Sequence, residues 1–574
     1  MNTFNNIYKR MVKGKGMLCL SLLASGLSLA SCSDYLEILP LNEVVLENFW
    51  TKKDDVTSVL NSCYESLGEE KSLERIGVWG EMRSENIVSG QNVPNHYNEV
   101  LKENLLPTNE LVDWSSMYRT INRCNTVIHY APGVADKDPN YTHDQMLANV
   151  AEATFIRDLA YFYLIRAFRD VPMSFEPSID DTKEYAIAAT PMMDALKILS
   201  EDLEKVKDNA VRRYVDDSKM TTREMAVSAR ENCSKVTRVA IYALLADIYL
   251  WRGEYDKCIQ CCDYVIDFKK NQYAEKVANI GELNDIYLFK GIPMIRESIL
   301  NSKYCGNAYS EIFGDGFSFE SIFELGYLQN STENKYVSNN YINGDGLYGR
   351  FGAPEDLYQN VASGRNDYLA KNDCRVYENI HEQNGKFWIV KYGFTDYAFE
   401  TENITSAGPR ISYARRSSNN ANWIFYRLSD VMLIKSEALI MKGESEFQKA
   451  FSLINTINKR ARNYNESVKS DTLVFSAYSS SKEEMEKLLM LERKREFMFE
   501  GKRWFDLVRK SLRDGNTRYL SNEATQKQKE NAVAIKIQLA DPNAMFWPYS
   551  REELKKNNLL KQNSAYSDSE QFIK

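Results

Sequence analysis

The chain has 574 residues, of which 44% are hydrophobic and 26% are charged, and its formal net charge is -8 at pH 7. This composition is typical of a large folded body and excludes a chain that is disordered throughout. The acidic balance argues against nucleic acid and against an anionic membrane surface as partners, because both attract proteins with an excess of Lys and Arg.

The N-terminus has the order of an export signal. Basic residues come first, an apolar run follows from Met17 to Leu29, and small residues stand directly before Cys32. The run is shorter than the ~20 apolar residues that cross a bilayer, so we expect cleavage rather than a membrane span. Small residues before a cysteine are typical of a lipobox, and we predict a lipoprotein signal peptide over residues 1–31 and lipidation of Cys32. An ordinary signal peptide with a chance cysteine is the alternative.

Helical periodicity dominates the rest of the chain. In residues 149–168 the apolar positions recur mostly every three or four residues, which predicts a helix with a buried face, and residues 114–131 would supply its neighbour. Residues 235–267 and 430–462 each contain two such runs separated by a glycine. Hairpins of this kind resemble tetratricopeptide repeats, which need stacked neighbours to bury their apolar faces. We predict a mainly α fold on a tetratricopeptide-like helical hairpin scaffold.

Between residues 271 and 420 the pattern changes to short aromatic runs broken by Gly, Asn, Ser and Asp. Residues 386–393 resemble a strand within this stretch. Long irregular insertions on a rigid scaffold often carry function. We therefore predict a large loop-rich insertion with short strands over about 271–420, which forms the ligand lobe, on a scaffold made of about 40–270 and 421–574.

Ten cysteines could suggest disulfides or a metal site. They are spread along the chain without a compact framework, and Cys258, Cys261 and Cys262 have no histidine nearby. Their positions in a helical pattern favour small buried side chains. We assign no metal and no cofactor.

The segment around residue 500 has the spacing of a charged helix. Glu496 and Glu500 are four residues apart and Arg503 follows three later, which predicts ion pairs along one helix face. The apolar residues predicted to anchor the packing beside them are Trp504, Phe505 and Leu507. We predict a structural role for this segment.

Motifs spread over nearly the whole chain occur in an order that resembles a known family. They are Cys32 to Leu36, Gly80 to Asn86, Tyr161 to Arg166, Asp170 to Pro172, Tyr242 to Ala246, Tyr426 to Val431, Ser436 to Ala438, Arg493 to Phe497, Glu500 to Leu507, Phe546 to Tyr549, and Gln562 with Asn563. In these motifs the chain resembles the SusD/RagB family of surface lipoproteins from Gram-negative bacteria. The resemblance implies a SusD-like single body over residues 32–574, lipid-anchored at the cell outer membrane and exposed at the surface.

The resemblance also implies a function. Members of the SusD/RagB family bind nutrients, often glycans and in some members peptides, as a lid over a SusC-like TonB-dependent transporter in the outer membrane. It is not a catalytic family. We therefore expect a protein that binds an oligomeric nutrient, foremost a glycan, and delivers it to such a transporter.

Two clusters of polar and aromatic residues are the candidate ligand-binding residues. Sugars present apolar C–H faces that stack on aromatic rings, and hydroxyls that pair with Arg, Asn and Asp side chains. The first cluster is Arg83, Asn86, Asn95, His96 and Tyr97, and the second is Tyr341, Tyr348, Arg350 and Phe351. Packing in the core is the alternative for any single aromatic residue, because aromatic side chains bury large areas.

Three other functions stay open from the sequence. A peptide-uptake lipoprotein would share the same architecture. A tetratricopeptide-type scaffold would bind peptides or assembly partners on its concave face. A glycosidase would need two carboxylates about 5–10 Å apart across a cleft, and no nucleophile or metalloprotease motif supports catalysis. We therefore expect a binding protein and not an enzyme.

Overall fold

The computed structural model describes residues 49–178, 186–296, 298–300, 303–305, 307–328, 332–341, 349–357, 373–399, 411–416, 419–462, 473–528 and 530–570. Residues 52–574 form one compact unit. The leader and Cys32 lie outside the described residues, so the signal peptide and the lipid anchor stay predictions. Within the described part of the chain, no helix is both long enough and apolar enough to cross a membrane.

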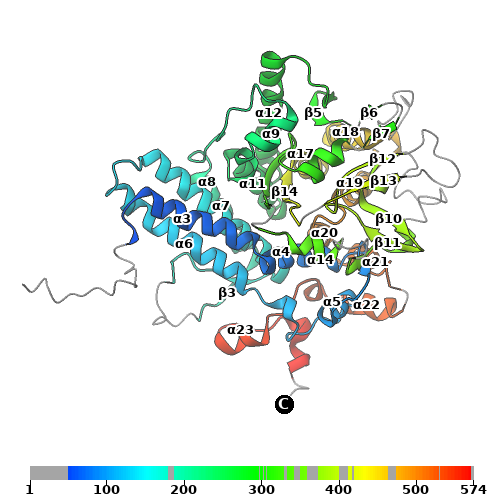
Figure 1. Ribbon diagram of the computed structural model, residues 1–574. Coiled ribbons are helices and arrows are strands. Elements are labelled where there is room, and N and C mark those ends of the chain that lie inside the picture. The colour runs from blue at the N-terminus through cyan, green and yellow to red at the C-terminus, as the bar shows by residue number, and fades with distance from the viewer. Residues whose placement is uncertain are drawn as a thin grey trace, which may run out of the picture. The chain divides into compact units, whose positions relative to one another are not determined.

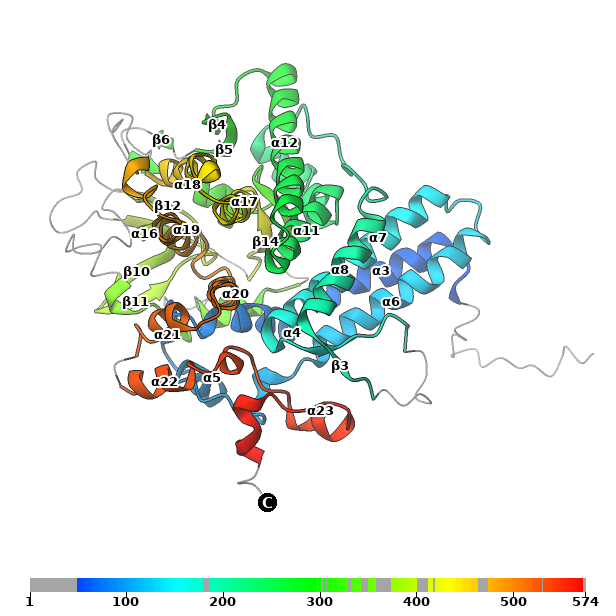
Figure 2. The same cartoon turned by 180° about the vertical axis from the view of Figure 1, so that it is seen from behind.

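Four helices pack in a row at the start of this unit. They are α3 (Lys53–Gly68), α6 (Ser115–Ala135), α7 (His143–Phe168) and α8 (Met192–Val206). α3 packs on α6, α6 on α7, and α7 on α8 (Figure 1, Figure 2). α7 begins at a capping box between Thr142 and Gln145, and all its side chains from Ala151 onwards are buried. The predicted pair of helices over 114–131 and 149–168 is confirmed.

The row continues through helices from both halves of the sequence. They are α11 (Arg238–Arg252), α12 (Tyr255–Ile280), α17 (Leu428–Lys442), α18 (Phe447–Arg462) and α19 (Lys482–Phe497). α8 contacts α11, α11 pairs with α12, and α12 packs on α17, which pairs with α18. Gly253 takes the left-handed conformation, with φ 72°, that lets the chain turn between α11 and α12. The two predicted hairpins, and with them the mainly α fold, are confirmed.

Shorter elements connect these helices. The α-helices are α4 (Glu70–Gly77), α5 (Asn95–Leu101), α9 (Thr222–Ser228), α10 (Glu231–Ser234), α13 (Asn307–Tyr309), α14 (Lys335–Asn340), α16 (Arg375–Asn379), α20 (Arg503–Asp514), α21 (Arg518–Ala524), α22 (Ala532–Gln538) and α23 (Arg551–Lys556). Two π-helical turns lie at Val78–Met82 and Ser310–Asp315. Short 3-10 turns lie at Glu110–Val112, Glu444–Glu446, Phe475–Ala477, Pro542–Met545 and Ser564–Glu570.

The strands form small antiparallel sheets. One has the order β1 (Val88–Ser89), β9 (Phe351–Gly352), β11 (Lys386–Ile389) and β10 (Ile380–Gln383). A second has the order β13 (Ile411–Arg415), β12 (Phe394–Phe399), β7 (Lys303–Cys305) and β6 (Ser298–Leu300). Three pairs are β14 (Trp423–Arg427) with β8 (Ser321–Leu325), β2 (Val171–Pro172) with β3 (Ala189–Thr190), and β4 (Ile286–Phe289) with β5 (Ile292–Ile295). The predicted strand over 386–393 is β11. β1 comes from outside the predicted insertion, so a short early segment completes one of the sheets of the insertion.

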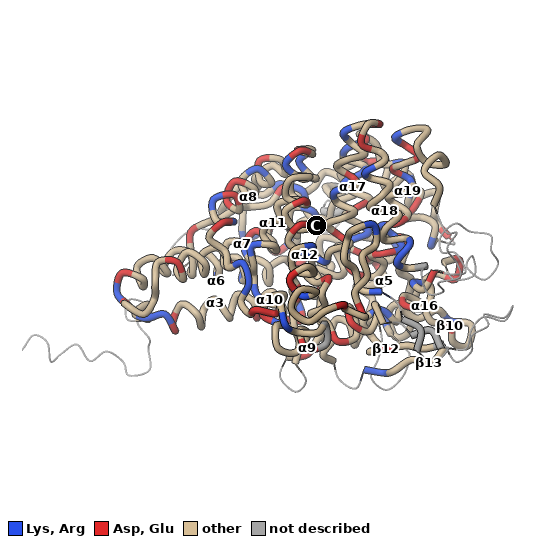
Figure 3. Tube along the Cα trace, turned by 90° about the horizontal axis from the view of Figure 1, so that it is seen from above, with Lys and Arg blue, Asp and Glu red and all other residues tan. Residues whose placement is uncertain are grey.

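Charge is mixed over the molecule. In the view of Figure 3, Lys and Arg are interspersed with Asp and Glu along the helices and are not separated by sign. Seven cysteines in the described part of the chain are buried, and none of them forms a disulfide with another: Cys63, Cys124, Cys233, Cys258, Cys261, Cys262 and Cys374. For these seven, the prediction of small buried side chains is confirmed.

A network of buried charges joins the late helices to the insertion. At its centre, Glu496 of α19 accepts hydrogen bonds from Arg375, Arg427 and Arg460, with N–O distances of 2.9, 2.6 and 2.5 Å. All four side chains are at most 6% exposed. Because the arginines come from α16, β14 and α18, one carboxylate connects four elements.

The arginines of this network are not paired with Glu496 alone. Each arginine has a second acidic partner, namely Glu492 for Arg375, Glu500 for Arg427 and Glu320 for Arg460. Burial by itself would raise the pKa of Glu496, but the arginines around it hold the pKa well below its usual range. Glu496 is therefore ionised at neutral pH inside the core.

The predicted helical ion pairs among Glu496, Glu500 and Arg503 are wrong. α19 ends before Glu500, and the left-handed backbone of Phe499 (φ 67°) and Gly501 (φ 70°) turns the chain before α20 begins. The three residues therefore share no helix face. Arg503 pairs instead with acids from other segments, Glu85 at 2.7 Å and Glu523 at 2.9 Å. The predicted packing anchors are at most 1% exposed and are confirmed: Trp504, Phe505 and Leu507.

Replacing Glu496 with Gln should lower the free energy of unfolding by about 3–5 kcal/mol, because three buried guanidinium groups lose their shared counter-charge. Urea denaturation of the full chain, followed by circular dichroism, measures this change. Glu552→Gln is the control, since its carboxylate is 66% exposed and its removal should leave the midpoint where it is. A loss below about 1 kcal/mol for Glu496→Gln would show that the network does not depend on this carboxylate.

Candidate functional site

The two predicted ligand clusters meet in space although more than two hundred residues separate them. β1 pairs with β9, with Val88 opposite Gly352 and Ser89 opposite Phe351. The ring of Tyr97 packs edge-on against that of Phe351, with 5.1 Å between centroids. The clusters therefore belong to one region of the molecule.

Two polar members of the first cluster are internal. Arg83 is fully buried, where it donates to Glu103 and to the Met545 carbonyl and lies over the Trp504 ring. Asn86 is also fully buried and donates to Glu81 at 2.7 Å. Both side chains satisfy polar groups of the core and present no surface to a ligand.

The described aromatic members are internal as well. Tyr97, Tyr341 and Phe351 are at most 1% exposed. The Tyr341 hydroxyl donates to the Phe499 carbonyl at 2.9 Å, and the Tyr97 hydroxyl bonds to Glu74. Burial raises the pKa of Tyr341 well above its usual range. These three rings pack in the interior below the surface of this region. Core packing is the alternative to ligand binding that the sequence left open for any single aromatic residue. Tyr348 lies outside the described residues.

The remaining predicted residues lie at the surface above these rings. Asn95 is exposed and donates to Glu99 at 2.9 Å, while Arg350 is half-buried. The His96 ring is 25% exposed, with its Nδ1 3.8 Å from a Glu110 oxygen.

Two residues that the sequence did not single out complete this surface. The Ser89 hydroxyl donates to Asn98 at 2.6 Å, which ties β1 to α5. We call Ser89, Asn95, His96, Asn98 and Arg350 the loop surface. Ser89 and Asn98 carry no motif, and only the pairing of β1 with β9 places them here.

A second feature is a groove along α3, with a volume of about 1010 Å³. α3 and the first half of α7 form one wall. α10 forms the other, with lining residues from 211–214, 317–328 and 332–335. We call it the α3 groove, and define it by Thr57, Tyr64, Glu152, Tyr214, Lys235 and Phe317. Its residues come from distant parts of the sequence, so no local motif could have indicated it.

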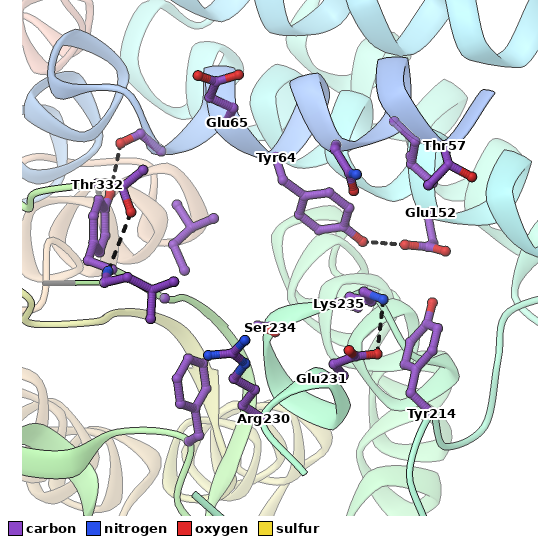
Figure 4. Close-up of a pocket in the computed structure, with 18 of the residues that line it drawn as sticks. Thr57, Tyr64, Glu65, Glu152, Tyr214, Arg230, Glu231, Ser234, Lys235 and Thr332 are labelled. Atoms are coloured by element: carbon purple, nitrogen blue, oxygen red, sulfur yellow. Dashed lines mark hydrogen bonds and ion pairs between the residues drawn. The ribbon is translucent and has the colours of Figure 1, made fainter. Parts of the chain in front are cut away.

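A hydrogen-bonded cluster forms the floor of the α3 groove (Figure 4). The Tyr64 hydroxyl donates to Glu152 at 2.5 Å and accepts from the Val236 N–H at 2.9 Å. The Tyr214 hydroxyl donates to the Val236 carbonyl at 3.1 Å. Burial raises the pKa of Glu152, and the hydrogen bond from Tyr64 opposes this rise. The two rings are thus held in place by the buried Glu152 carboxyl and by the backbone N–H and C=O of Val236.

Two family models match the chain. The model of the SusD family matches residues 404–566, and a model described as "Starch-binding associating with outer membrane" matches residues 34–250. Together they span more than half of the chain, in the order that the motifs predicted. The chain belongs to the SusD family.

Relatives and solved structures agree with this SusD-family membership. SusD-like protein P38 of Formosa agariphila is 23% identical over 94% of this chain and 96% of its own length. SusD-like protein P2 of the same organism is 25% identical over 85% of this chain and 89% of its own.

Among solved structures, a SusD superfamily protein from Bacteroides vulgatus has a TM-score of 0.63 at 18% identity, covering 90% of this chain and all of that one. A structure named as a laminarin binding SusD-like protein has a TM-score of 0.58 at 17% identity, with the same coverage. These likenesses confirm the SusD fold.

Replacing Tyr64 with Phe should lower the free energy of unfolding by about 1–3 kcal/mol, because Glu152 and the Val236 N–H both lose a partner. The loss should be larger at neutral pH than near pH 4.5, the ordinary value for a Glu carboxyl. Without the Tyr64 hydroxyl the pKa of Glu152 rises further, and a raised carboxyl pKa destabilises the fold as pH increases through it. Thermal melts at both pH values measure the effect.

The matched control for this prediction is Tyr287→Phe, since Tyr287 is 51% exposed on β4. It should melt like the parent protein at either pH. If Tyr64→Phe loses the same stability at both pH values, the Tyr64 hydroxyl does not affect the pKa of Glu152.

Proposed function

We propose that this SusD-family protein is a surface-exposed lipoprotein, anchored through Cys32, that binds an oligomeric glycan and delivers it to a TonB-dependent transporter of the outer membrane. One observation supports the ligand-binding part of this proposal: residues of the two predicted clusters come together in one surface, the loop surface, on a packed base. Ligand sites are often built in this way, with adaptable polar groups set on packed elements.

The chemistry of the loop surface supports a glycan. It offers a hydroxyl, two amides, an imidazole and a guanidinium, which together can donate to and accept from sugar hydroxyls. The packed rings of Tyr97 and Phe351 hold the elements that carry these groups. The laminarin-binding SusD-like structure gives a precedent for glycan binding on this fold.

The acids near the loop surface support binding and not catalysis. Both oxygens of Glu99 accept hydrogen bonds, one from Asn95 and one from Asn109, each at 2.9 Å. Glu110 is largely exposed beside His96. A glycosidase needs one protonated and one ionised carboxyl facing each other across the substrate, and these two acids are not held in that way.

Calorimetric titration of the full chain against oligosaccharides of starch, laminarin, xylan and mannan, and against a peptide digest, tests the ligand class. A detergent without a sugar headgroup keeps the anchor soluble without competing. We expect heat from one glycan class and a rise of about tenfold in Kd for Arg350→Ala, because a charged donor to a sugar hydroxyl contributes about 1.4 kcal/mol.

Arg518→Ala is the matched control, since Arg518 is an exposed arginine on a different element. If only the peptide digest gives heat, the ligand is a peptide nutrient and the proposal of a glycan is wrong. Unchanged affinity in Arg350→Ala and in His96→Ala would remove the loop surface as the binding site.

The anchor is tested separately. Cys32→Ala should move the protein from the membrane fraction to the soluble fraction, because the acylated residue is gone while the body over residues 52–574 is unaltered. Fractionation followed by immunoblotting measures the distribution. Asp34→Ala is a neighbouring control that should stay with the membrane, and retention of Cys32→Ala would contradict anchoring at this residue.

A further inference from the structure

The α3 groove is a feature separate from the loop surface. Its walls come from α3, α7 and α10, whereas the loop surface comes from β1, α5 and the residue before β9. Residues from Lys53 to Gly68 line it along one face of α3, a helical rise of about 23 Å. A cleft of this length suits an extended chain of several units, and its volume of about 1010 Å³ lies at the upper end of the range for ligand pockets.

Two aromatic rings at the floor of the groove are fixed by hydrogen bonds within the protein itself. Tyr64 and Tyr214 are half-buried. The Tyr64 hydroxyl accepts from the Val236 N–H, and the Tyr214 hydroxyl donates to the Val236 carbonyl. In Figure 4 the hydroxyls of both tyrosines point toward Glu152, from two different walls of the groove. Rings that are already fixed lose little conformational entropy when a ligand packs against them.

A third ring is held toward the Gly68 end by a strained backbone. Phe317 has φ 50°, a left-handed conformation that is rare for a large side chain. A Cβ on Gly326 would lie 2.5 Å from the Phe317 ring, so the glycine makes room for the ring. Strained residues of this kind cluster at ligand sites, where the surrounding structure holds them. Phe317 itself is half-buried at the groove.

Among the described residues, the groove is lined by four cations and six acids, and one of these acids, Glu69, pairs with Arg119 outside the groove. Lys235 pairs with Glu231 at 2.9 Å, and Lys335 with Glu70 at 3.6 Å. The lining side chains that have no ion pair among the described residues include both signs, with Lys53 and Arg230 against Glu65 and Glu333. A groove without a dominant sign favours neither a polyanion nor a strongly basic peptide.

The rim of the groove is rich in neutral polar groups. Thr57, Asn61 and Gln145 are exposed along its edge, and Ser234 is half-buried across from them. Hydroxyls and amides both donate and accept, as the hydroxyls of a sugar require. From the length, the held rings, the mixed charge and this rim, we propose that the α3 groove is a second binding site, for an extended uncharged oligosaccharide. It goes beyond the proposed function, because it adds a site that does not depend on the loop surface.

Hydrogen exchange of the full chain tests the second site directly. Exchange is measured by mass spectrometry with and without uncharged hexaoses of glucose, mannose, xylose and galactose, in a detergent without a sugar headgroup. One hexaose should slow exchange in residues 53–68 and 230–236. Phe317→Gly should raise its Kd at the groove by about threefold to tenfold through loss of the ring.

Phe317→Gly also removes the strained backbone of a large residue, so its melting temperature should not fall by much. Weaker protection of the groove in a variant that stays folded therefore identifies a ring that contacts the ligand. A second variant, Asn61→Trp, fills the rim without touching the core and should abolish protection of the groove. Asn140→Trp, at an exposed turn outside the groove, is its matched control and should protect like the parent.

Several outcomes would overturn the second site. One is that no hexaose protects the groove, and another is that hexaoses protect only residues 88–99 and 349–357. Protection by charged peptides and by no hexaose would make it a peptide site and would equally overturn the proposal. The loop surface is tested by its own variants, so either site can fail while the other stands.

Discussion

The arrangement of this protein depends on charges that are kept inside it. Glu496 lies in the core with three guanidinium groups around it, each of which holds a further carboxylate. A charge removed from water is tolerable only when its partners are close and well oriented. The network therefore acts as a constraint on position. α16 of the insertion, β14, α18 and α19 have to meet at one place, and the insertion cannot move relative to the helices without leaving ions unpaired.

This constraint explains how a loop-rich insertion can carry a defined surface. Lys391, between the two larger sheets in sequence, donates to the carbonyls of Glu496 and Met498, which ties the insertion to the end of α19. On the far side, β1 and β9 join the insertion to the early segment that carries α5. The loop surface thus stands on a base held from two directions. The α3 groove is built from different elements. Its floor is held in place by the hydrogen bonds of Tyr64 to Glu152 and to the Val236 N–H.

The helical scaffold was predictable because its signals are local. Periodic apolar positions and glycines such as Gly253 act within a few residues, so the hairpins over 235–267 and 430–462 follow from short-range geometry. The predictions that failed required knowledge of where a helix stops. Glu496, Glu500 and Arg503 have helical spacing, but the turn at Phe499 and Gly501 separates them, and their partners are distant in sequence. Arg83 likewise looked like a ligand residue, because the sequence does not show that Glu103 and the Met545 carbonyl would enclose it.

By itself the sequence determined the mainly α class, the helical hairpins and the family, since these rest on periodicity and on the order of motifs. It also carried the predicted signal peptide and lipidation residue, which lie outside the described structure. Only the tertiary structure decided which polar and aromatic residues face solvent and which face the core. It also decided that two loop clusters form one surface and that α3 lines a groove. The physical reason is that burial and ion pairing are properties of contacts between distant segments, and the free energy of those contacts is not encoded in the spacing of neighbouring residues.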